Sequence, residues 1–194
     1  FLGLSDRFEA SLDVARVLAR RTQAGADLGV DVQYMRTPNR LAISAALLSD
    51  VSVIHVMGHG RERLSPSIVS DWGDEYRVKD QRSLQLELDV WPLGHCLILD
   101  ACKTWTAGWR RAISRCLLPG QEILFVGSNK SISWAQATLF TSNFYASAMR
   151  ERLTGYLDED WEGLQRSCES ASEAYVLLAH ERCPFEFEWL KGDG

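Results

Sequence analysis

The sequence lacks the features that mark several common classes of protein. No apolar run in its 194 residues approaches the roughly 20 residues that a membrane-spanning helix requires. No basic segment followed by an apolar stretch opens the chain, so no secretory signal peptide is predicted. Acidic residues outnumber basic ones, 26 to 21, which argues against direct binding of nucleic acid. These absences favour a domain that engages neither a membrane nor a nucleic acid.

The spacing of the cysteines is typical of neither a disulfide framework nor a zinc-binding site. The five cysteines include no C-x-x-C pair, and their odd number suits neither a set of disulfide bonds nor a zinc ribbon. Free thiols are typical of a reducing compartment, so we expect a cytoplasmic location. His55 and His59 are four residues apart, but four residues of a strand span about 13 Å, too far for one metal ion. We therefore expect no metal, and without a phosphate-binding loop we expect no cofactor.

Short apolar strands alternate with helices along the chain. We expect strands at 30–34, 51–57, 84–90, 96–99, 123–126 and 185–190, and helices at 8–21, 38–48, 104–117, 134–152 and 164–178. The polar segment 60–82 is expected to be a long functional or mobile loop. This order predicts one α/β domain with a mostly parallel sheet. Because the sequence begins at Phe1, we expect it to be part of a larger protein.

Reactive side chains follow two of the expected strands. His59 and Gly60 come directly after the strand at 51–57, and Cys102 follows the strand at 96–99. If these strands are neighbours in a parallel sheet, His59 and Cys102 face each other at its carboxyl edge, where ligands bind. An imidazole can take the proton of an attacking thiol and return it to the leaving group. The N–H groups of Gly60 and Cys102 could bind an oxyanion. The alternative is that Cys102 is a buried structural thiol.

Two segments resemble the catalytic segments of caspase-like cysteine peptidases: VIHVMGHG at 53–60 and CLILDAC at 96–102. The segments AYVLLA at 174–179, PF at 184–185 and WLKGD at 189–193 are similar to the end of the CHAT branch of that family. Domains of this branch are often joined to helical repeats or sensor modules. The resemblance covers roughly residues 8–193 and implies a caspase-like three-layer α/β/α sandwich. It implies that Cys102 is the nucleophile, His59 the general base and acid, and Gly60 a donor to the oxyanion.

The resemblance also bears on substrate selection. In metacaspase-like relatives the acidic residue two before the cysteine selects a basic side chain at P1, and Asp100 holds that position. The caspase pattern Ser-Trp-Arg, whose arginine binds an aspartate, is SWA at 133–135, so cleavage after aspartate is not expected. Ser128 and Asn129 follow the strand at 123–126 and are further candidates for substrate contact. Asp100 could instead be a structural residue at a strand end, and Ser128 and Asn129 parts of a polar loop.

The expected function is therefore that of a cysteine endopeptidase that cleaves a protein or peptide after arginine or lysine. We expect a fused or bound sensor module to activate it by reshaping the 60–82 segment. The resemblance suggests a prokaryotic stress or antiviral defence pathway. Two alternatives remain open. One is a catalytically silent caspase-like scaffold that binds a partner with the same surface. The other is a flavodoxin-like binder of a nucleotide or phosphate, for which the sequence offers no Gly-rich loop.

Overall fold

The chain divides into two compact units. The computed structural model describes residues 2–3, 13, 17, 35–36, 51–61, 67–69, 75–77, 95–115, 117–153 and 161–192. The first unit comprises Phe1–Asp6, Met35–Ile132 and Phe185–Gly194, and the second comprises Arg7–Tyr34 and Ser133–Pro184. The strands expected at 30–34 and 84–90 and the helix expected at 38–48 lie outside the described residues. So does the helix at 8–21, except for Asp13 and Val17, which are helical.

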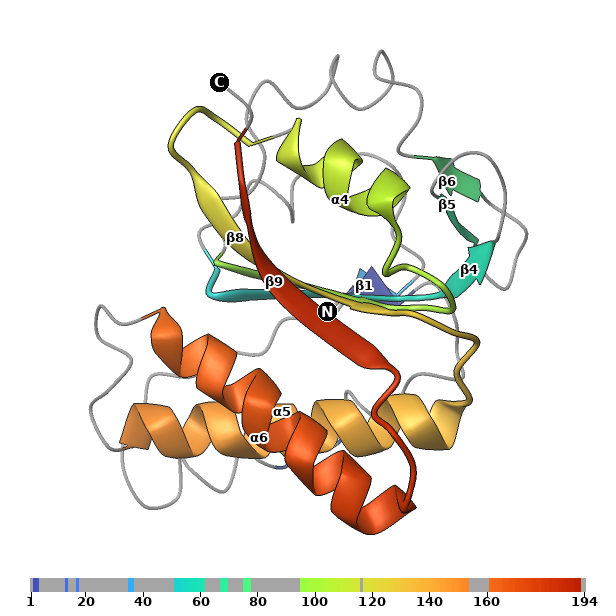
Figure 1. Ribbon diagram of the computed structural model, residues 1–194, viewed down its shortest axis with the longest axis vertical. Coiled ribbons are helices and arrows are strands. Elements are labelled where there is room, and N and C mark those ends of the chain that lie inside the picture. Colours follow the sequence, from blue (N-terminus) through green and yellow to red (C-terminus); the bar gives the residue numbers. More distant parts are fainter. Residues whose placement is uncertain are drawn as a thin grey trace. The chain divides into compact units, whose positions relative to one another are not determined.

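The first unit contains a six-stranded mixed sheet (Figure 1). Its strands are β1 (Leu2–Gly3), β2 (Met35–Arg36), β3 (Val53–Met57), β7 (Cys96–Asp100), β8 (Glu122–Ser128) and β9 (Phe185–Lys191). They run in the order β2-β1-β3-β7-β8-β9, and every pair is parallel except β8 with β9. The predicted α/β class and mostly parallel sheet are therefore confirmed. The strands β3 and β7 are neighbours, as the expected site requires.

The apolar core of this unit lies between the sheet and helix α4 (Ala107–Ser114), which covers one sheet face (Figure 1). Its members come from three parallel strands, α4, β9 and the segments that follow β7 and α4: Ile54, Val56, Leu97, Leu99, Ala101, Trp109, Ile113, Leu117, Ile123, Phe125 and Leu190. Trp105 stacks on Phe125 at a centroid distance of 5.4 Å and carries the Arg110 guanidinium over its ring at 5.2 Å. Arg110 also pairs with Glu188 at 3.1 Å. These contacts fix the start of α4 against the sheet.

Helix α4 begins later than the sequence predicts. Thr106 is its N-cap, and the Thr106 hydroxyl accepts the N–H of Trp109 at 3.2 Å. The expected start at Thr104 is wrong because the Thr104 hydroxyl accepts the N–H of Ser128 at 2.9 Å instead. Both threonines are plausible caps from sequence alone, and a contact 24 residues away decides between them.

The expectation of a long loop over residues 60–82 is wrong for the part of it that the structure describes. Strands β4 (His59–Arg61), β5 (Ser67–Val69) and β6 (Glu75–Arg77) form a small antiparallel sheet. In its register His59 pairs with Val69 and Gly60 with Ile68. Strands of three residues are too short to show an alternating pattern among so many charges, which is why the sequence did not reveal them.

The second unit contains two long helices that lie side by side, α5 (Trp134–Leu153) and α6 (Glu162–Ala179) (Figure 1). Both helices are predicted by the sequence. Ser133 and Gln136 open α5 with a reciprocal capping box: the Ser133 N–H donates to Gln136 Oε1 at 2.9 Å, and the Gln136 N–H donates to Ser133 Oγ at 3.3 Å. Helix α6 ends at His180, which has a left-handed φ of 54°. No helix among the described residues is both long and apolar enough to cross a membrane.

Candidate active site

The register of β3 and β7 aligns the two segments that carry His59 and Cys102. The ladder pairs Val53 with Cys96 and continues to Met57 with Asp100. Beyond the last pair, the Gly58 N–H still donates to the Asp100 carbonyl at 3.2 Å. His59 and Cys102 each follow two residues after this last pair. The sequence-based expectation that both follow neighbouring strand ends is thus met by the backbone.

Gly60 lies directly against the main chain of Cys102. A Cβ atom built on Gly60 would overlap the Cys102 carbonyl oxygen and would lie 2.7 Å from its carbonyl carbon and 3.0 Å from its nitrogen. Only a residue without a side chain can approach another backbone this closely. The His-Gly pair and the cysteine, which are more than 40 residues apart in sequence, therefore belong to one compact site.

Cys102 is the accessible thiol among the described cysteines. Cys96, Cys168 and Cys183 are buried free thiols, whereas Cys102 is partly exposed. Burial raises the pKa of Cys96 well above its ordinary value, so that thiol is held in its unreactive neutral form. His59, which precedes Gly60, is exposed. Both residues therefore keep exposed surface, as a nucleophile and its base would require.

The Cys102 sulfur is held by the backbone of Ile132. The Ile132 N–H donates to Sγ at 3.4 Å, and the thiol can donate in turn to the Ile132 carbonyl at 3.6 Å. An N–H donor at the sulfur favours the thiolate, whereas a carbonyl acceptor favours the protonated thiol. Ile132 directly precedes the N-cap of α5, and no sequence motif marks it. The proximity of Ile132 to the Cys102 sulfur is visible only in the folded chain.

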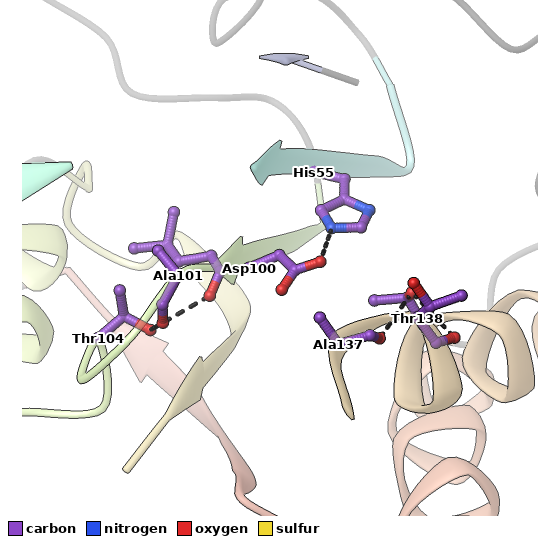
Figure 2. Close-up of polar contacts among 8 residues, drawn as sticks. His55, Asp100, Ala101, Thr104, Ala137 and Thr138 are labelled. Atoms are coloured by element: carbon purple, nitrogen blue, oxygen red, sulfur yellow. Dashed lines mark hydrogen bonds and ion pairs between the residues drawn. The ribbon is translucent and has the colours of Figure 1, made fainter. Parts of the chain in front are cut away.

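A dense set of hydrogen bonds joins the Cys102 loop to the loop after β8. The buried Thr104 hydroxyl lies 3.2 Å from the Ala101 carbonyl (Figure 2) and 3.1 Å from the Leu99 carbonyl. It also accepts the N–H of Ser128. The Lys103 N–H donates to the Lys130 carbonyl at 3.1 Å, with Lys103 at a left-handed φ of 54°. A non-glycine residue in that region costs about 1–2 kcal/mol. The turn after the cysteine is therefore held by its partners rather than by local preference.

Asp100 lies beneath this loop and faces His55. Figure 2 shows the Asp100 carboxylate at the end of β7 pointing to the imidazole of His55 on β3, with Nε2 and Oδ2 3.4 Å apart. Both side chains are buried, with exposed fractions of 0% and 1% respectively. Burial lowers the pKa of His55, and the Asp100 carboxylate acts in the opposite direction. The sequence singles out Asp100 as a substrate-pocket residue but gives no reason to pair it with His55.

The two remaining candidates have partners of their own. Ser128 is buried, and its hydroxyl donates to the Lys130 carbonyl at 2.8 Å within the same loop. Asn129 is exposed and donates to Glu186 of β9 at 2.9 Å. Ser128 therefore shapes the loop that carries Ile132, and Asn129 lies on its outer side. In the part of the chain that the structure describes, no group of three or more histidine, cysteine, aspartate or glutamate residues is placed to hold a metal ion.

Comparison with models of known protein families finds no match for this sequence, and neither does a search of curated proteins.

Proposed function

We propose that this chain is a cysteine endopeptidase of caspase-like fold, in which His59 and Cys102 form the catalytic dyad. The observation that carries the proposal is the close approach of Gly60 to the Cys102 backbone, which brings His-Gly and the cysteine into one site. The parallel pairing of β3 with β7 and the exposure of both reactive side chains support it. The caspase-like three-layer sandwich and the CHAT assignment are part of the same proposal and rest on the sequence resemblance.

The chemistry would proceed in two halves. His59 accepts the thiol proton as Cys102 Sγ attacks the peptide carbonyl carbon, and the N–H groups of Gly60 and Cys102 stabilise the oxyanion. The C–N bond then breaks, His59 protonates the departing amine, and a thioester remains on Cys102. His59 next removes a proton from a water molecule that attacks the thioester. Collapse of the second tetrahedral intermediate releases the carboxylate product and restores the thiol.

A basic P1 residue is the substrate class that this proposal favours. Asp100 is two residues before the nucleophile and carries a carboxylate, which pairs bidentately with arginine or as a point charge with lysine. Ser128 and Asn129 complete the candidate substrate-binding set. The substrate would be a protein or peptide.

Activation by a fused or bound sensor module fits the position of the small sheet. His59 and Gly60 are themselves residues of β4, paired with β5. Any rearrangement of β4–β6 would displace the catalytic base, so this sheet is a suitable place for control. A cytoplasmic role in a prokaryotic stress or antiviral defence pathway belongs to the same proposal.

The second candidate function is a catalytically silent scaffold. The observation that favours it is the double engagement of Cys102 Sγ by the N–H and carbonyl of Ile132. A scaffold could keep that contact permanently, whereas a peptidase must release the thiol proton.

Cleavage assays separate the two candidates. Fluorogenic peptides that end in arginine, lysine, aspartate or leucine are offered to the wild type and to Cys102→Ala. Cleavage after arginine or lysine that disappears in the variant supports the peptidase and its basic P1. Cleavage after leucine or aspartate alone retains the nucleophile and overturns the role of Asp100. No cleavage by the full-length protein with its partner favours the scaffold.

A further inference from the structure

The peptide bond between Ile132 and Ser133 is held at both of its polar groups. On one side, the Cys102 thiol donates to the Ile132 carbonyl at 3.6 Å. On the other side, the Ser133 N–H donates to Gln136 Oε1 at 2.9 Å. The first contact lies within the first unit of the chain and the second within the second unit. The covalent bond between Ile132 and Ser133 is what joins the two contacts.

The geometry of a peptide group makes these two contacts depend on each other. The group is planar and trans, so its C=O and its N–H point in opposite directions and turn together. Whatever fixes the direction of the Ser133 N–H therefore also fixes the direction of the Ile132 carbonyl. Gln136 thus acts on the acceptor of the Cys102 thiol through the main chain. The Ile132 N–H, which also contacts Sγ, belongs to the preceding peptide group and is not fixed in this way.

The Gln136 amide has partners that favour one orientation of its two ends. Its Oε1 accepts the Ser133 N–H, and its Nε2 donates to Glu181 Oε1 at 2.6 Å. Exchanging the two ends would set an N–H against an N–H and an oxygen against a carboxylate oxygen, so both contacts would become repulsive. The acceptor of the Ser133 N–H is therefore fixed in identity as well as in place.

Glu181 is in turn held by Tyr175 of α6. The Tyr175 hydroxyl donates to the same Glu181 oxygen at 2.6 Å, and the Tyr175 side chain is buried. Burial and the contact with Glu181 raise the pKa of Tyr175, so its hydroxyl keeps its proton and remains a donor. Because a buried, packed ring has little freedom to move, Glu181 has a fixed place from which to orient Gln136.

We propose that Gln136 is a positioning residue for Cys102, because it directs the Ile132 carbonyl at Sγ and so sets where the resting thiol donates. Glu181 orients the Gln136 amide for this task. In the proposed peptidase the same carbonyl competes with His59 for the thiol proton, so Gln136 holds the nucleophile in its resting state. That second part rests on the proposed function, whereas the positioning of the thiol does not.

The first test observes the S–H group of Cys102 by infrared spectroscopy. Its stretching band is identified by subtracting the spectrum of the same protein with Cys102→Ala, and a thiol that donates absorbs at lower wavenumber than one that does not. In Gln136→Met the side chain keeps its length but offers no acceptor to the Ser133 N–H. We expect the Cys102 band to move to higher wavenumber. An unchanged band in folded Gln136→Met, or a wild type without a Cys102 S–H band, would overturn the proposal.

An exchange of the two side chains is the matched control. In the double variant Gln136→Glu with Glu181→Gln, a carboxylate accepts the Ser133 N–H as in a standard capping box, and the new amide supplies the N–H between the two side chains. The net charge does not change, and Ser133 Oγ still caps α5 in both variants. We expect the Cys102 band at its wild-type position in the double variant. A band displaced equally in Gln136→Met and in the double variant would overturn the role of the Gln136 amide.

The second test measures catalysis in the full-length protein with its partner, using the best peptide of the cleavage assay. Because one hydrogen bond of the resting thiol is released, Gln136→Met should raise kcat by roughly two- to tenfold and leave KM unchanged. The double variant should return kcat to the wild-type value. An unchanged or lower kcat in Gln136→Met would overturn the hold on the nucleophile. If no protein cleaves while the infrared result stands, the peptidase function and that hold fail together, and the positioning of Cys102 by Gln136 stands.

Discussion

Gly60 lies so close to Cys102 that a Cβ atom at this position would overlap the Cys102 carbonyl oxygen. This close approach brings the main chain that follows β3 against the main chain that follows β7. The geometry of the candidate dyad therefore depends on the absence of a Cβ atom at residue 60, which can be tested by mutation.

Gly60→Ala should destabilise the protein by about 3 kcal/mol, since backbone atoms have little freedom to move away from the new methyl group. Denaturant unfolding gives the value, and thiol labelling of Cys102 in the folded protein should change as well. Gly120→Ala is the matched control. Its Cβ would meet no atom within 4 Å, but its φ of +82° is left-handed. We expect a cost of about 1–2 kcal/mol there and no change in labelling. Equal effects of the two variants would contradict the close approach.

Thr104→Val should cost about 1–3 kcal/mol in the free energy of unfolding. Valine preserves the shape but leaves the buried Ser128 N–H without its acceptor at 2.9 Å. Thr141→Val serves as the control. That buried hydroxyl is itself a donor, to the Ala137 carbonyl at 2.9 Å within α5. A smaller loss for Thr104→Val than for Thr141→Val would show that the loop does not depend on this bond.

Stability should fall in acid because of His55. Its pKa is lowered in the folded protein by burial, while the unfolded value is near 6.5. The unfolded chain therefore binds the proton more readily, so the free energy of unfolding decreases as the pH falls below about 6.5. His55→Gln removes this proton uptake, and its stability should decline less between pH 7 and pH 5. Urea unfolding at several pH values measures both proteins. Parallel curves would contradict a neutral, buried His55.

Ile132→Pro removes the N–H that donates to Cys102 Sγ and keeps the carbonyl. Hydrogen bonds to charged groups contribute about 1.5–3 kcal/mol, so labelling of the thiolate by iodoacetamide at pH 7 should slow by roughly tenfold or more. Ile132→Val retains both backbone groups and should label like the wild type. If the proline variant labels at the wild-type rate, Ile132 does not stabilise the reactive form of the sulfur.

The long elements could be predicted from the sequence, because their patterns are strong. β3, β7 and β8 are compact apolar runs, and α5 and α6 carry an apolar residue every three or four positions. The pairing of β3 with β7 then brings together the two segments that carry His59 and Cys102. By contrast, β4–β6 are too short to show a period, and the choice of Thr106 over Thr104 as helix cap depends on Ser128.

The contacts of Asp100 and Cys102 could not be predicted for a different reason. Each joins a side chain to a partner on another strand or loop, His55 in one case and the Ile132 backbone in the other. His55 looks like an ordinary strand residue, and a backbone N–H leaves no trace in a sequence. Only the folded chain reveals what lies beside each candidate residue.

The most direct test of the central claim compares the labelling of two cysteines in one protein. The rates of iodoacetamide modification of Cys102 and of the buried Cys168 are followed by mass spectrometry in the wild type and in His59→Ala. We expect Cys102 to react much faster than Cys168 in the wild type, and to lose most of that advantage when His59 is removed. An equal rate for Cys102 in both proteins would contradict a His59–Cys102 dyad.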